Sequence, residues 1–141
     1  MRFMMLMIPK GYERAEPGFT PDPKAMEAMT KYNDSMRKAG VMIDCEGLHP
    51  PSAGARVTFK GGKPTVSNGP FPEAKEALGG FWMMQVNSQQ EALEWAKRCP
   101  ASDNETIEVR QVQEMEDFPD DIQNAVNPPA AKAQHERRPG T

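Results

Sequence analysis

The chain has 141 residues, 38% of them apolar, and a formal net charge of −3. This length suits one domain, and the low apolar fraction indicates that part of the chain lies outside the core. The acidic balance argues against a nucleic-acid-binding protein, which usually presents a basic face. Two cysteines, Cys45 and Cys99, make neither a disulfide framework nor a zinc-site spacing, so we expect no metal and no cofactor.

The apolar run near the amino terminus, residues 3–8, is shorter than the hydrophobic region of a signal peptide, which spans roughly 7–15 residues. No small-residue cleavage site follows it. No stretch approaches the roughly 20 apolar residues that a membrane span requires. We therefore expect a cytoplasmic protein that binds no membrane and no nucleic acid.

The first elements are a strand and a helix. Residues 2–8 form a mostly apolar run that predicts a buried strand. Asp22 offers a capping oxygen, and Pro23 suits the first helical position because its missing N–H costs nothing there. Gly40 suits the left-handed position after the helix. Met26, Met29, Asn33 and Met36 follow at helical spacing, so the three methionines are expected to lie along one stripe with Tyr32 beside them.

Residues 41–48 predict a second strand, which ends before two prolines that cannot donate to a sheet. Residues 55–59 and 65–67 are short extended pieces on either side of a Gly-Gly turn, which indicates a hairpin. After a sharp break at residues 68–71, we expect one or two helical turns over residues 73–78.

The second half of the domain repeats the strand-and-helix order. Residues 81–86 predict an apolar strand, and Ser88 with Glu91 forms a capping box that begins a second helix. That helix ends at Pro100. Residues 106–110 alternate, so that Ile107 and Val109 can face the core of a half-buried last strand. Both tryptophans, Trp82 and Trp95, are expected to be core or interface anchors.

The domain is expected to span residues 1–115. Residues 116–141 are acidic and then rich in proline, and we expect this tail to be largely irregular or disordered. The order β-α-β, hairpin, β-α-β is the split arrangement of a ferredoxin-like α+β fold. Two helices would cover one face of the sheet, and a second copy of the chain is the simplest cover for the other, so we expect a homodimer.

Six short motifs occur in a fixed order: EGLHPP at residues 46–51, NGPF at 68–71, EAKE at 73–76, LGGF at 78–81, EALEWA at 91–96 and IEVR at 107–110. As an ordered set over roughly residues 1–115, they resemble the DGPF branch of the YCII-related family. The resemblance implies a dimeric α–β barrel, in which two ferredoxin-like subunits pack their sheets face to face. Most members lack an assigned reaction. A few resemble small-molecule enzymes that use a His/Asp pair, and others sit beside extracytoplasmic-function sigma factors.

Two residues of these motifs are candidate catalytic groups. His49 is the only histidine inside the domain, since His135 lies in the tail, and its imidazole could act as general base or acid. Its other interpretation is a loop histidine followed by prolines. The family normally has aspartate where this chain has Asn68. Asparagine keeps the ability to form the turn, but it cannot accept a proton near neutral pH, so any acid–base role at this position is in doubt.

The remaining candidates are ligand-binding residues near the same motifs. Glu46 could orient the imidazole or stand in solvent, and Lys75 could bind a carboxylate-bearing ligand or belong to a solvated helix start. The turn residues have a backbone role as their alternative interpretation. The set of candidate ligand-binding residues is Glu46, Gly69, Pro70, Phe71, Glu73 and Lys75.

Three functions fit these observations. The favoured one is a small-molecule-binding protein, or a regulator linked to sigma-factor systems, because the domain is small, acidic and poor in catalytic pairs. The alternative is a cofactor-independent lyase or isomerase that uses His49. The third is an interaction module whose acidic residues 114–121 and tail meet a protein partner.

Overall fold

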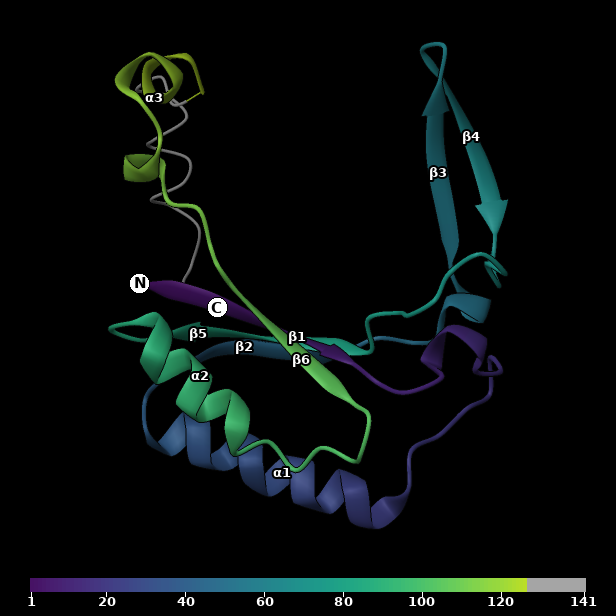
Figure 1. Ribbon diagram of the computed structural model, residues 1–141, viewed down its shortest axis with the longest axis horizontal. Helices are drawn as coiled ribbons and strands as arrows, with labels where there is room; N and C mark the ends of the chain where they lie inside the picture. The colour runs from purple at the N-terminus through teal and green to yellow at the C-terminus, as the bar shows by residue number, and fades with distance from the viewer. Residues whose placement is uncertain (127–141) are drawn as a thin grey trace.

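The computed structural model describes residues 1–126 and has two layers, an antiparallel sheet with two helices on one face (Figure 1). The strand order β2-β5-β1-β6 is that of a ferredoxin-like α+β fold, which confirms the expected fold class. The strands of this sheet are β1 (Arg2–Ile8), β2 (Met42–Gly47), β5 (Gly80–Gln85) and β6 (Thr106–Gln111).

The helices begin where the capping residues predict. In α1 (Pro23–Lys38), the Asp22 carboxylate accepts hydrogen bonds from the first free backbone N–H groups. In α2 (Gln89–Lys97), the Ser88 hydroxyl accepts a hydrogen bond from the Glu91 backbone N–H at 3.1 Å. The remaining helical pieces are three short 3₁₀ turns and a last helix, namely η1 (Tyr12–Arg14), η2 (Pro51–Ala53), η3 (Met115–Asp117) and α3 (Asp120–Val126).

The core lies between the sheet and the two helices. Alternate residues of β1 point into it, with Phe3, Met5 and Met7 buried. Both tryptophans are buried there, as expected. The Trp82 indole N–H donates to the Asn33 side chain at 2.7 Å, and the Trp95 carbonyl accepts from the Tyr32 hydroxyl at 2.7 Å, so these polar groups of the core are satisfied.

The expected apolar stripe of α1 is shorter than the sequence pattern predicts. Tyr32 and Met36 are buried and Met29 is half-buried, but Met26 is 51% exposed. Helix α2 is short and lies beside the second half of α1 only (Figure 1), so the first turns of α1 have no neighbouring helix to pack against. Periodicity alone does not show where a partner element ends.

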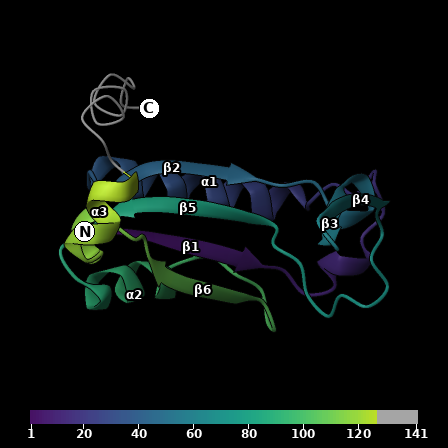
Figure 2. The same cartoon turned by 90° about the horizontal axis from the view of Figure 1, so that it is seen from above.

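Strands β3 (Ala55–Lys60) and β4 (Lys63–Asn68) form a separate hairpin that stands away from the sheet (Figures 1 and 2). Its turn residues, Gly61 and Gly62, both have positive φ, which only glycine adopts without strain. The hairpin projects from one end of the strands toward the side that carries no helix. At the other end of the strands, α3 projects toward the same side.

Two segments fold differently from what their sequence predicts. Residues 73–78 are irregular instead of helical, because this short segment has few apolar side chains to pack and must carry the chain from the hairpin to β5. Residues 120–126 form a helix where an irregular tail was expected. The proline-rich end, with His135, lies outside the described residues.

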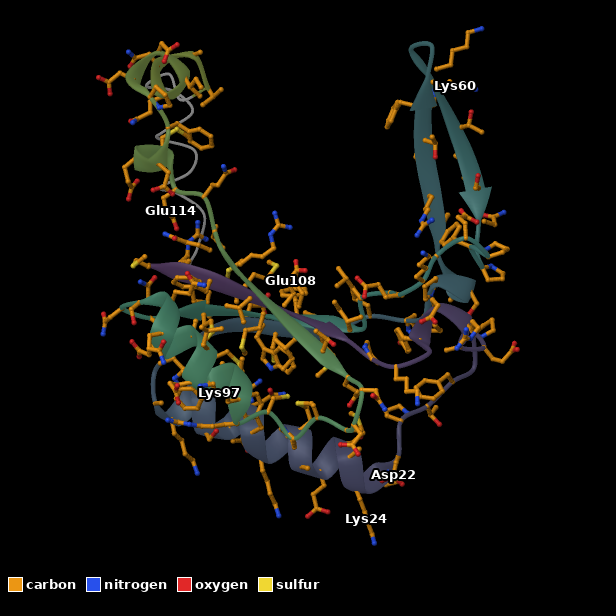
Figure 3. The ribbon with its side chains drawn as sticks, in the orientation of Figure 1. Asp22, Lys24, Lys60, Lys97, Glu108 and Glu114 are labelled. Atoms are coloured by element: carbon orange, nitrogen blue, oxygen red, sulfur yellow. The ribbon has the colours of Figure 1, made fainter. Side chains whose placement is uncertain are left out.

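The helix-free face of the sheet carries an apolar centre with charged edges. Cross-strand partners align there in rows: Asp44, Met83, Met4 and Arg110 form one, and Glu46, Phe81, Leu6 and Glu108 form the next. In each row the two central side chains are apolar and only half-buried. Figure 3 shows Glu108 on this side of the sheet, away from the helices.

Candidate functional site

The two recognised motifs that hold His49 and Asn68 meet at the base of the hairpin. The loop after β2 is fixed to the start of β5 by the Leu48 N–H, which donates to the Gly79 carbonyl at 2.9 Å. The turn after β4 is fixed to the same loop, because the Gly69 N–H donates to the Gly54 carbonyl at 2.9 Å. Segments about 20 residues apart in the sequence are thereby held together.

Gly69 has a specific steric role in this junction. A Cβ at this position would lie 2.7 Å from the Pro51 carbonyl carbon and closer still to its oxygen, so no side chain fits without backbone movement. The residue is joined to Pro70 by a cis peptide bond. The glycine that the sequence suggested as a backbone device therefore allows direct backbone packing between the two motifs.

His49 lies exposed in the loop, and its neighbour Leu48 is held by a tyrosine. The Tyr12 hydroxyl donates to the Leu48 carbonyl, and burial raises the pKa of Tyr12 so that the hydroxyl keeps its proton. No side chain within the described range hydrogen-bonds the His49 imidazole. The expected catalytic histidine is thus positioned through its backbone, with no orienting carboxylate.

Arg56 brings a cation into the junction. Its guanidinium lies 4.0 Å from the ring centroid of buried Phe71, and one of its nitrogens lies 3.5 Å from the Glu73 carboxylate. Two predicted ligand-binding residues, Phe71 and Glu73, therefore act together to hold this arginine. Arg56 was missed by sequence reasoning, although its place on the polar side of the hairpin was a usable signal.

The other candidate side chains are exposed, and they do not form one group with Arg56. Asn68 is the last residue of β4, opposite Ala55, and is exposed. Pro70 and Lys75 are also exposed, and Lys75 forms no ion pair with any residue of the described range. Glu46 lies apart, on the helix-free face at the end of β2, where it is opposite Phe81.

One further acidic residue near the junction was missed by sequence reasoning. Glu13 lies in η1, which packs against η2. Its side chain is buried, and its carboxylate lies 3.8 Å from the Arg14 guanidinium. The Ser52 hydroxyl, from η2, donates to the Ala15 carbonyl at 2.6 Å and joins the two turns. An isolated Glu-Arg dipeptide in a loop gives no signal of burial, so this residue could not be found from the pattern.

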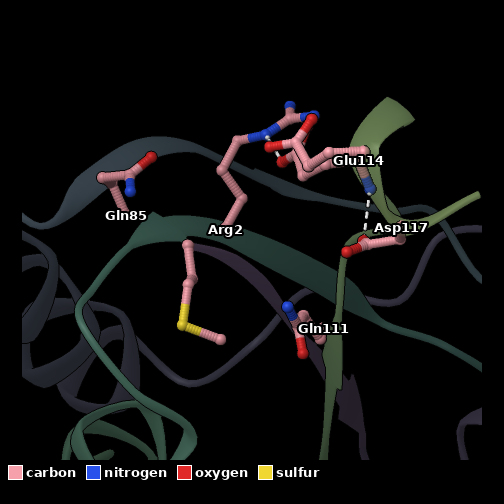
Figure 4. Close-up of a pocket in the computed structure, with 7 residues that line it drawn as sticks. Arg2, Gln85, Gln111, Glu114 and Asp117 are labelled. Atoms are coloured by element: carbon pink, nitrogen blue, oxygen red, sulfur yellow. Dashed lines mark hydrogen bonds and ion pairs between the residues drawn. The ribbon is translucent and has the colours of Figure 1, made fainter.

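A hollow of about 530 Å³ lies at the opposite end of the sheet from His49 (Figure 4). Arg2 and Glu114 form a two-pronged ion pair there, with nitrogen–oxygen distances of 2.6 and 3.0 Å. The hydrogen bond that Arg2 donates to the Glu114 carboxylate raises the pKa of Arg2. Side chains of Gln85, Gln111 and Asp117 complete the wall. We call this feature the Arg2 hollow.

The described part of the chain shows no sign of a metal centre or a membrane span. Across residues 1–126, no group of three or more His, Cys, Asp or Glu side chains is placed to hold a metal ion. No helix in the same range is both long and apolar enough to cross a membrane.

Comparison with known proteins identifies a family for this chain. The model of the YCII-related domain family matches residues 1–116. An uncharacterised protein of Rhizobium meliloti (strain 1021), R00369, is 32% identical over 76 residues, which cover 54% of this chain and 61% of that protein. The chain therefore aligns with less than two thirds of this relative's length.

Proposed function

The chain belongs to the YCII-related family, and from this premise we propose that it is a homodimer that binds a small anionic molecule where the His49 loop meets the Asn68 turn. The observation that carries the ligand site is the junction itself. Gly69 packs backbone to backbone against Pro51, and the exposed Arg56 stacks on Phe71, two residues after Gly69.

The helix-free face supports the dimer. Its two central rows place apolar pairs side by side, Met4 with Met83 and Leu6 with Phe81, and all four side chains are only half-buried in a single copy. Burying this surface against a second sheet would be favourable at about 25 cal/mol per Å². A second copy presents the same surface, so the contact is self-complementary.

The junction is better suited to hold a negative charge than to transfer a proton. Arg56 is stacked on Phe71 at 4.0 Å and tethered by Glu73, so little freedom remains to be lost when a carboxylate or phosphate binds. Lys75 and His49 are also exposed, and neither side chain has a hydrogen-bond or ion-pair partner among residues 1–126. A planar guanidinium above an aromatic ring also favours flat, aromatic acids.

Binding of a ligand can be tested by thermal shift with a panel of small aliphatic and aromatic carboxylates and phosphates. We expect at least one to raise Tm, and Arg56→Gln to abolish that shift. Arg98→Gln is the matched control, because Arg98 also stacks on a ring, that of Trp95 at 4.6 Å, but at the end of α2. A panel without any shift, or an unchanged shift in Arg56→Gln, would contradict the proposed site.

The enzyme alternative makes a different prediction. With asparagine at position 68 and no carboxylate bonded to His49 in the described structure, a His/Asp pair is missing. Asn68→Asp would restore the family residue. Turnover of a bound ligand that appears in Asn68→Asp and disappears in His49→Ala would favour a lyase or isomerase. A ligand-binding dimer without turnover would instead suit the regulatory link to sigma factors that the resemblance implies.

A further inference from the structure

The hairpin has one apolar side, and the described structure leaves that side uncovered. Val57 and Val66 are direct cross-strand partners on it, and Phe59 follows opposite Pro64. Their exposed fractions are 53% for Val57, 66% for Val66 and 73% for Phe59. Because a two-stranded hairpin is only marginally stable in water, an apolar side of this size needs a cover.

The segment of residues 114–126, at the other end of the sheet, is complementary in charge. The hairpin, residues 55–68, contains Arg56, Lys60 and Lys63 and no acidic residue, whereas residues 114–126 contain acidic residues and no lysine or arginine. Lys60 and Lys63 make no ion pair within residues 1–126. In the acidic segment the same is true of Glu116, Asp120 and Asp121.

The acidic segment also offers apolar surface and a fixed position. Ile122 and Val126 of α3 are 41% and 58% exposed. The Arg2–Glu114 ion pair ties the start of the segment to β1. Figures 1 and 3 show the hairpin, with Lys60 at its tip, and the acidic segment, with Glu114 at its start, rising from opposite ends of the same helix-free face.

We propose that the hairpin of each copy docks on the acidic segment of the other copy in the homodimer. This inference rests on the proposed dimer, in which the two helix-free faces meet. Two such faces can be related by a two-fold axis along the strands or across them. An axis along the strands would place hairpin against hairpin and acidic segment against acidic segment. An axis across the strands places each hairpin over the partner's acidic segment, and the charges select this second arrangement.

This docking also covers the Arg2 hollow. The hollow lies between the end of the sheet and the acidic segment, and Glu116 and Asp117 line it (Figure 4). Lys60 and Lys63 are cross-strand partners on the polar side of the hairpin, opposite its apolar side. A hairpin that enters from the second copy between the hollow and α3 would turn its lysines to the carboxylates of the acidic segment and its apolar side to Ile122 and Val126. The hairpin and the hollow, which lie far apart in one copy, then form one interface.

Charge exchange provides the test, with the dimer dissociation constant measured by sedimentation equilibrium. We expect Lys60→Glu/Lys63→Glu to raise that constant by about tenfold or more, and Asp120→Lys/Asp121→Lys to do the same, since each creates like-charge contacts in both halves of the dimer. Combining all four changes should bring the constant back to within about threefold of the original. Lys24→Glu/Lys38→Glu, which makes the same charge change on α1, should leave the constant unchanged.

A second variant probes the apolar side. Phe59→Ser should raise the dissociation constant by about tenfold or more without changing the circular dichroism spectrum, because Phe59 contacts little within its own copy. A protein that is monomeric at all concentrations would overturn the dimer itself. A dimer dissociation constant that does not change in the lysine variant, or that the combined variant does not restore, would overturn the docking alone. The acidic segment would then be free to contact a different protein partner.

Discussion

Replacement of Gly69 by alanine is the sharpest test of how the two motifs are joined. The new Cβ would lie 2.7 Å from the Pro51 carbonyl carbon, whereas carbon atoms normally approach to about 3.5–4.0 Å. The backbone must therefore move by roughly 1 Å, which strains or breaks the 2.9 Å hydrogen bond from the Gly69 N–H to the Gly54 carbonyl. Overpacking costs about 1–3 kcal/mol and the hydrogen bond about 1 kcal/mol, so we expect a loss of roughly 2–4 kcal/mol.

The assay is urea denaturation of Gly69→Ala beside Gly54→Ala. At Gly54 an added Cβ would lie an ordinary 3.5 Å from the Pro51 oxygen, and the backbone φ of −111° is open to alanine. The control should therefore stay within about 0.5 kcal/mol of the original protein. A loss of 2–4 kcal/mol corresponds to a Tm that falls by roughly 10 °C for a domain of this size. Equal stabilities for the two variants would refute the steric argument.

Three further outcomes are expected. Trp82→Phe should lower the free energy of unfolding, measured by urea denaturation, by about 1–2 kcal/mol. A double-mutant cycle with Asn33→Ala should give a coupling energy of about 1 kcal/mol from the 2.7 Å hydrogen bond between the two side chains. Additive losses would mean that this bond contributes nothing to stability. Burial raises the pKa of Cys99 from 9.0 to about 11, so the unfolded thiol ionises first. The contribution of this thiol to the free energy of unfolding should hold below pH 9 and be lost between pH 9 and 11, by at most about 2 kcal/mol, and Cys99→Ala should reduce the fall measured over that range. Arg2→Ala should speed amide hydrogen exchange over residues 112–118 and lower the free energy of global unfolding by less than about 1 kcal/mol. Unchanged exchange would show that the ion pair does not hold this segment.

The secondary structure could be predicted well wherever a local chemical signal was strong. Asp22 with Pro23 and Ser88 with Glu91 mark helix starts through their own hydrogen bonds, and those bonds are present in the structure. The hairpin follows from its Gly-Gly turn, and both turn glycines have positive φ. Strand order followed from the β-α-β pattern, because few topologies suit it.

Other features depend on contacts between distant residues and were out of reach. Met26 carries the same periodic signal as Met36, yet it is exposed because α2 does not extend that far. The Arg2–Glu114 ion pair joins residues 112 positions apart, which no local pattern encodes. Residues 73–78 have helix-forming composition but no apolar face to pack, so the irregular path to β5 prevails.

The candidate site divides in the same way. The motifs predicted a site shared by the segments around His49 and Asn68, and the structure packs these segments together through Gly69 and Pro51. The contacts of single side chains could not be predicted from the motifs. Phe71 and Glu73 were predicted to bind a ligand, which stays a prediction, and in the structure both contact Arg56, which no motif singled out.

The hairpin interrupts the connection between β2 and β5, which are antiparallel neighbours in the sheet. Neighbouring antiparallel strands need no more than a short turn to join them, so none of the sheet register depends on the hairpin. Insertions or exchanges in residues 55–68 should thus leave the two-layer scaffold intact. The residues that build the scaffold are therefore separate in the chain from those of the hairpin.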